Sequence, residues 1–189
     1  MTGDVPPEAS VRAFMALPFA EADVARLADL IESLRPGTAA VRWTRRDALH
    51  LTLRFLGASS PRALDSIGAR LRRETAGVAP ASVRPSGLGL FPERGKARVL
   101  WLGLDLPRAL LDLQRACEEA ARDAGFAPEP RAFVPHVTLG RWRSPARRPD
   151  LPAVDLGAMP VDRVVVFRSD PGRDGAVYTP LQVHALGGS

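Results

Sequence analysis

The chain has 189 residues, of which 46% are hydrophobic and 25% are charged, the balance of a folded domain rather than of a disordered chain. Its apolar runs are only as long as strands, so we expect no membrane helix, no secretory leader and a cytoplasmic protein. A single cysteine, Cys117, excludes an internal disulfide and an all-cysteine metal site. The 26 basic residues against 21 acidic ones include one lysine. Arginine suits phosphate geometry, but charge alone does not distinguish an anion site from a solvated surface.

Hydrophobic patterning predicts eight strands and three helices in the order β-α-β-β-α-β-β-α-β-β-β. The predicted strands cover residues 11–17, 41–44, 49–56, 83–91, 98–105, 135–142, 161–168 and 177–186. The predicted helices cover residues 22–34, 60–75 and 107–124. Residues 1–10 are expected to form a flexible tail, and residues 144–152, with three prolines, an exposed loop.

Several predicted strands follow one another directly, without an intervening helix. This order favours an α+β protein with mainly antiparallel sheet over a doubly wound parallel one. No glycine-rich phosphate loop follows any strand, so neither a P-loop nor a dinucleotide fingerprint is present.

The two halves of the chain repeat one short motif. Each half runs through a strand and a helix to a strand headed by histidine: His50-Leu51-Thr52-Leu53 in one half and His136-Val137-Thr138-Leu139 in the other. The chain has only three histidines, and two of them head this string. We take the duplication as the strongest functional signal in the sequence.

Strand alternation sorts the motif residues onto two faces. His50, Thr52 and Arg54 should share one face, while Leu51, Leu53 and Phe55 face the core. His136 and Thr138 likewise share a face. Arg141 has the wrong parity to join them, unless Gly140 permits a β-bulge or the strand ends there.

Two imidazoles and two hydroxyls facing one cleft suit the hydrolysis of a phosphodiester. Histidine titrates near neutrality, so a neutral one could activate water while a protonated one protonates the leaving oxygen. The threonines could hold the non-bridging oxygens, and an arginine could offset the developing charge. This mechanism needs no metal and no cofactor.

A zinc site is the main alternative use of the two histidines, but it lacks a third ligand. His184 has no matching threonine and is read as structural, and Cys117 as a small core residue. The aromatic residues near the motifs could stack a nucleobase or belong to the core. They are Trp43, Phe133 and Trp142.

Three strings resemble the two-histidine phosphoesterase superfamily, and within it the RNA 2′,3′-cyclic phosphodiesterases, also named 2′-5′ RNA ligases. They are Leu49-His50-Leu51-Thr52-Leu53-Arg54-Phe55-Leu56-Gly57, Ala97-Arg98-Val99-Leu100-Trp101-Leu102-Gly103 and Pro135-His136-Val137-Thr138-Leu139-Gly140-Arg141. The opening string Arg12-Ala13-Phe14-Met15-Ala16-Leu17-Pro18 is similar to that family's first strand. The resemblance covers residues 11–186.

The resemblance implies a single bilobal domain, residues 11–189, with pseudo-two-fold symmetry and a central cleft. It implies hydrolysis of RNA 2′,3′-cyclic phosphate to a 2′-phosphate, with 2′-5′ ligation as the reverse reaction. His50 would protonate the leaving 3′ oxygen, His136 would activate water, and Thr52 and Thr138 would hold the phosphate. Arg141 also matches a family site position, against the parity argument, and Arg54 stays a second candidate for phosphate.

Other functions remain open at this point. The same chemistry could act on a small cyclic nucleotide or an ADP-ribose cyclic phosphate, or the protein could bind RNA ends without turnover. The basic charge favours RNA. We expect a monomer, and the sequence does not identify the physiological RNA.

Overall fold

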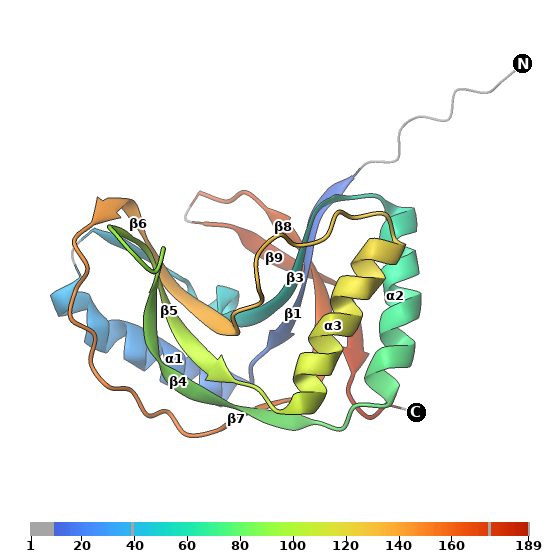
Figure 1. Ribbon diagram of the computed structural model, residues 1–189, viewed down its shortest axis with the longest axis horizontal. Helices are drawn as coiled ribbons and strands as arrows, with labels where there is room; N and C mark the ends of the chain where they lie inside the picture. The colour runs from blue at the N-terminus through green and yellow to red at the C-terminus, as the bar shows by residue number, and fades with distance from the viewer. Residues whose placement is uncertain (1–9, 39, 174, 189) are drawn as a thin grey trace, which may run out of the picture.

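The computed structural model describes residues 10–38, 40–173 and 175–188 (Figure 1). The strands are β1 (Val11–Pro18), β2 (Val41–Trp43), β3 (His50–Ser59), β4 (Ala81–Phe91), β5 (Ala97–Asp105), β6 (His136–Ala146), β7 (Met159–Val161), β8 (Arg163–Asp170) and β9 (Val177–Ala185). The helices are α1 (Glu21–Leu34), α2 (Pro61–Ala76) and α3 (Arg108–Asp123), with 3₁₀ turns η1 (Arg35–Gly37) and η2 (Arg46–Ala48). The predicted tail lies, apart from Ser10, outside the described residues.

The strands join in one strongly curled sheet in which every neighbouring pair is antiparallel. Its order is β7-β4-β5-β6-β3-β1-β8-β9, and β2 pairs with β6 off this path. The α+β prediction with mainly antiparallel sheet is confirmed. In the described residues, none of the helices combines the length and apolarity that crossing a membrane requires.

The repeat between the two halves of the sequence is also a repeat in the sheet. β3 pairs with β1 as β6 pairs with β5, so the strand order β5-β6-β3-β1 is symmetric about the β6–β3 boundary. Figure 1 shows α1 on the side of β4 and β5, while α2 and α3 lie together on the other side. The two histidine-headed strands therefore meet at the centre of the sheet.

Local sequence signals account for the helices that cover the core. Ser60 caps α2 by accepting a hydrogen bond from the backbone of Ala63, and Pro61 follows as a favourable first residue. Leu64, Ile67 and Leu71 recur at helical spacing and are buried.

The structure differs from the prediction at two places. β6 continues to Ala146, pairing there with Ala97 of β5, so part of the predicted 144–152 loop is strand. Tertiary pairing holds these polar residues in the sheet, although their own sequence favours a loop. The sequence pattern assigns Val161 to the following strand and does not predict the separate strand β7, because β7 forms by pairing with β4, which is distant along the chain.

Candidate active site

The two histidine motifs lie side by side because β3 and β6 pair antiparallel at Leu51 and Val137. Both of these side chains are fully buried. Residues one step away on either strand point to the opposite face. The antiparallel register sets His50 beside Thr138 and Thr52 beside His136. All four polar side chains of the duplicated motif therefore share the open face of the sheet.

His136 is held in one orientation by the segment just before its strand. Its Nδ1 donates to the carbonyl oxygen of Val134 at 2.7 Å, which leaves Nε2 for chemistry. The rings of Phe91 and Trp101 flank it, with centroids 5.2 and 5.9 Å away. Burial lowers the pKa of His136, the Val134 hydrogen bond opposes this, and the positive charge of Arg141 adds to the lowering.

His50 lies deeper in an aromatic pocket of the other half. It stacks on Phe14 with ring centroids 4.9 Å apart and meets the edge of Tyr178 at 5.3 Å. Its Nε2 is 3.1 Å from the hydroxyl of Thr52. Burial lowers the pKa of His50 to about 4; a hydrogen bond to the backbone of Ala48 opposes this, and the charge of His136 adds to it. This last effect couples the two histidines electrostatically.

A β-bulge interrupts each motif strand at the same place and overturns the simple alternation. Along β3 the pairing with β1 skips Leu53, and along β6 the pairing with β5 skips Leu139. Each skipped residue shifts every later side chain to the other face. Phe55 is therefore not a core residue: it is 57% exposed and takes the position that Arg141 has in the other half.

The same bulge brings Arg141 to the open face, exposed and near enough to His136 to affect its pKa. The parity argument against Arg141 is therefore wrong, because the β-bulge beside Gly140, one of the two exceptions left open from the sequence, is present. The parity argument that grouped Arg54 with His50 is wrong for the same reason, since Arg54 is buried at the bulge with 7% exposure.

Arg54 ties the β3 motif to the segment that leads into β6. Its guanidinium forms ion pairs with Glu118 of α3 and Glu129, and it donates to the carbonyl of Ala127. A buried guanidinium whose charge is balanced by two carboxylates has little left for a ligand. Arg54 therefore has a structural role: it fixes β3 to the segment that precedes His136.

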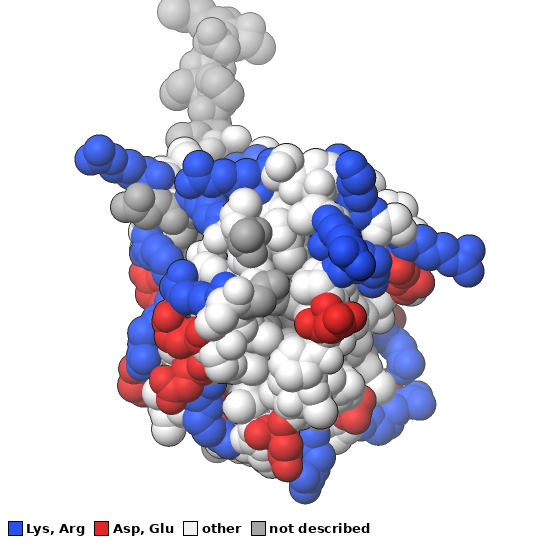
Figure 2. All heavy atoms as spheres, turned by 90° about the vertical axis from the view of Figure 1, so that its left-hand side faces the viewer, with Lys and Arg blue, Asp and Glu red and all other residues white. Residues whose placement is uncertain are grey.

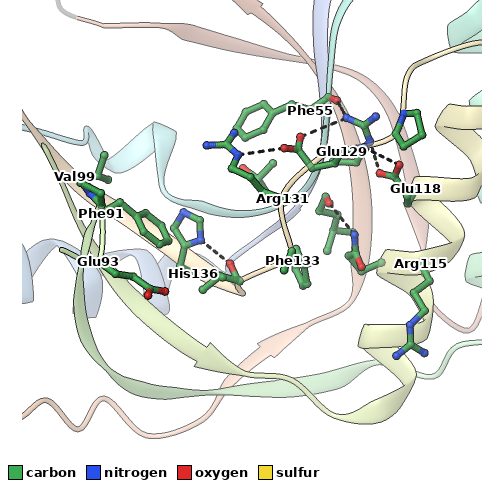
Figure 3. Close-up of a pocket in the computed structure, with 18 of the residues that line it drawn as sticks. Phe55, Phe91, Glu93, Val99, Arg115, Glu118, Glu129, Arg131, Phe133 and His136 are labelled. Atoms are coloured by element: carbon green, nitrogen blue, oxygen red, sulfur yellow. Dashed lines mark hydrogen bonds and ion pairs between the residues drawn. The ribbon is translucent and has the colours of Figure 1, made fainter.

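A groove of about 1050 Å³ runs from the motif strands to α3. Thr52, His136 and Arg141 line one end of it. Figure 3 shows Phe91 beside His136 at that end, with Glu118 and Glu129 toward α3. A smaller cavity of about 170 Å³ lies on the other side of Phe55. The exposed side chain of Phe55 therefore lines both the groove and the smaller cavity.

The structure also places the remaining candidates from the sequence. His184 is buried beside Gln182, and Cys117 is fully buried, which raises the pKa of its thiol to about 12. Trp142 is a core residue, Trp43 is half-buried under the guanidinium of Arg35, and Phe133 lines the groove. Within the described residues, no three His, Cys, Asp or Glu side chains gather as metal ligands would.

Sequence reasoning missed the aromatic residues around the histidines, among them Phe14, Phe91 and Tyr178. They belong to β1, β4 and β9, which are distant along the chain from the motifs. Only the strand order of the sheet brings them to the imidazoles.

Comparison with known proteins identifies the family of the chain. Residues 19–173 match the family model described as the 2′-5′ RNA ligase superfamily. The RNA 2′,3′-cyclic phosphodiesterase of Methanothermobacter thermautotrophicus is 33% identical over 183 residues, covering 93% of this chain and 99% of the relative. Among solved structures, TT0787 of Thermus thermophilus superposes with a TM-score of 0.84 at 28% identity, covering 94% of this chain and 98% of that one. E. coli LigT complexed with 3′-AMP superposes with a TM-score of 0.81 at 25% identity and the same coverages.

A curled antiparallel sheet with paired His-x-Thr strands at its centre defines the class of two-histidine phosphoesterases. Within that class, the chain belongs to the 2′-5′ RNA ligase superfamily, in the family of RNA 2′,3′-cyclic phosphodiesterases.

Proposed function

We propose that this protein hydrolyses the 2′,3′-cyclic phosphate at RNA 3′ ends to a 2′-phosphate, acting in the cytoplasm as a monomer. The observation that carries the proposal is the register at Leu51 and Val137, which supports a site where the polar side chains of both motifs share one face of the sheet. One chain supplies all four groups. The relative from Methanothermobacter thermautotrophicus, named RNA 2′,3′-cyclic phosphodiesterase, supports the same reaction.

In the proposed reaction a water oxygen attacks phosphorus and the bond to the 3′ oxygen breaks. His136 takes the proton of the water at Nε2, and His50 gives a proton to the departing 3′ oxygen, following the family pattern. Thr52 and Thr138 hold the non-bridging oxygens, and Arg141 balances the charge that develops on them. Ligation of 2′-5′ ends is the reverse reaction.

The low pKa of His50 applies to the site without phosphate. A phosphate anion between the rings favours the charged form of both histidines and so raises their pKa values. Binding of the substrate therefore favours protonation of His50, which the transfer of a proton to the leaving oxygen requires.

The first experiment is hydrolysis of an oligonucleotide with a 2′,3′-cyclic phosphate end by the protein and by His50→Ala and His136→Ala. Each substitution should lower kcat by about 10²–10⁴, since each removes a proton-transfer group. The wild-type kcat/KM should follow a bell-shaped pH profile. Either variant keeping more than about a tenth of the activity would remove that histidine from the mechanism.

The roles of the two histidines are separated by a substrate whose 3′ leaving atom is sulfur, which departs without a proton. His50→Ala should recover much of its lost activity on this substrate, and His136→Ala should not. Recovery by His136→Ala instead would exchange the two roles.

A further inference from the structure

Beyond the histidines, a row of arginines without ion-pair partners among the described residues lies on β6 and the neighbouring strand β2. It consists of Arg141 and Arg143 of β6 and Arg42 of β2. Within the part of the chain that the structure describes, β2 pairs with β6 alone, and its register sets Arg42 opposite Arg141. Val41, the neighbour of Arg42, lies opposite the buried Trp142 on the core side. Cross-strand partners point to the same face, so Arg42 shares the open face with Arg141.

This arrangement puts two like charges directly opposite each other, which destabilises a sheet unless something neutralises them. Among the described residues, Arg42, Arg141 and Arg143 make no ion pair and no side-chain hydrogen bond. The arginines just outside β2 are neutralised by carboxylates, as Arg35 is by Glu32 and Arg46 by Glu21. The row is therefore left open to an external anion.

The row begins at the catalytic centre and leads away from it. Arg141 lines the same groove as His136, and its positive charge lowers the pKa values of His136 and of Tyr178 of β9, so it lies near the position proposed for the terminal phosphate. Arg42 extends from the next strand toward the β8–β9 turn, where a methyl group on Gly175 would lie 3.3 Å from one of its guanidinium nitrogens. Figure 2 shows Lys and Arg gathered over the upper part of the face that carries the left-hand elements of Figure 1.

We infer that Arg42 binds the backbone phosphate on the 5′ side of the terminal nucleotide. A mononucleoside 2′,3′-cyclic phosphate has no such group, whereas an RNA end always has one. Arg42 then makes the enzyme prefer RNA ends to free cyclic mononucleotides. This inference rests on the proposed function and names its substrate class.

The test compares a cyclic mononucleotide with a dinucleotide that ends in a 2′,3′-cyclic phosphate. For Arg42→Gln, kcat/KM on the dinucleotide should fall about tenfold, because one charge-assisted phosphate contact is lost. On the mononucleotide it should stay within about twofold. The slope of log kcat/KM against log salt should become shallower by about 0.7 for the dinucleotide alone.

Two variants serve as controls. Arg42→Lys keeps the charge, so it should keep the salt slope while losing part of the affinity. Arg62→Gln removes an exposed charge from α2, away from the groove, and should change neither substrate. Thermal melting of each variant checks that it is folded.

Equal losses on both substrates would overturn the inference, since Arg42 would then act on the terminal phosphate. An unchanged dinucleotide rate would overturn it too. A wild-type protein that turns over neither substrate would instead contradict the proposed function itself.

Discussion

The two histidines repeat one motif in unequal surroundings. His50 is enclosed by Phe14 and Tyr178 and has the lower pKa, about 4. His136 lies in the wall of the open groove. Below its ordinary pKa an imidazole is protonated in water but stays neutral where it is buried. Keeping His50 neutral therefore lowers the stability of the folded protein at acidic pH.

We predict that His50 makes the protein less stable in acid. Its pKa falls from 6.5 in the unfolded chain to about 4 in the folded protein, so the unfolded state binds more protons between these values. Its contribution to stability is present above pH 6.5 and lost as the pH falls toward 4. At pH 4.5 the loss is on the order of 2 kcal/mol.

Urea unfolding of the wild type and His50→Gln, from pH 7.5 to 4.5, measures this loss. The free energy of unfolding should fall less steeply in the variant, which has no titrating group at this position. Parallel curves for the two proteins would show that His50 is not buried in its neutral form.

Phe55 is the second residue whose surroundings predict a function. It is 57% exposed and occupies in its half the place of Arg141 in the other. We predict that Phe55→Ala raises KM by about 5- to 150-fold, because a nucleobase stacked on the ring contributes about 1–3 kcal/mol. The free energy of unfolding should change little. Steady-state kinetics on a dinucleotide checks this, and an unchanged KM would exclude stacking there.

At the scale of the strands, the paired bulges decide which side chains face the site. In β6 the bulge lies at Leu139 and Gly140 and brings Arg141 to the open face. A Cβ on Gly140 would lie 2.5 Å from Val41 and 3.3 Å from the carbonyl oxygen of Arg42. Glycine is therefore required here by the close approach of β2, and not by an unusual backbone angle.

We predict that Gly140→Ala destabilises the protein by about 1–3 kcal/mol, the usual cost of overpacking. It should also lower activity, since β2 and Arg141 must shift. The matched control is Gly77→Ala at the end of α2, where a Cβ has nothing within 4 Å and φ is −87°. Denaturant unfolding of both variants checks the difference. Equal stability of the two would show that the close approach of β2 does not require glycine at position 140.

At the scale of the whole molecule, the site exists only where the two halves of the chain meet. β3 and β6 pair through Leu51 and Val137, and Arg54 adds a second link through its ion pairs to Glu118 and Glu129. Neither half holds both motif histidines by itself, since His50 comes from one half and His136 from the other.

We predict that the activity of the whole protein needs no metal ion, because imidazole and hydroxyl groups supply both the proton transfers and the phosphate contacts. Protein treated with a chelator should hydrolyse the cyclic-phosphate oligonucleotide at the untreated rate. Loss of activity that added zinc restores would contradict the metal-independent mechanism.

The sequence by itself determined the order of the three helices and of every strand except β7, the antiparallel fold class and the duplicated His-x-Thr motif, because hydrophobic period and turn residues are local properties. Alternation also held from His50 to Leu53, where Leu51 is buried and both polar side chains are partly exposed. The family of the chain could be identified from the same strings.

Only the tertiary structure decided where the side chains beyond the two motifs point. A bulge forms where one strand has an extra residue relative to its pairing partner, and the sequence of one strand does not show this. Alternation therefore could not predict that Phe55 faces the open site or that Arg54 forms buried ion pairs. The aromatic walls and the Arg42–Arg141 pair likewise come from strands far apart in sequence. Their contacts depend on strand order and register, which local patterns do not encode.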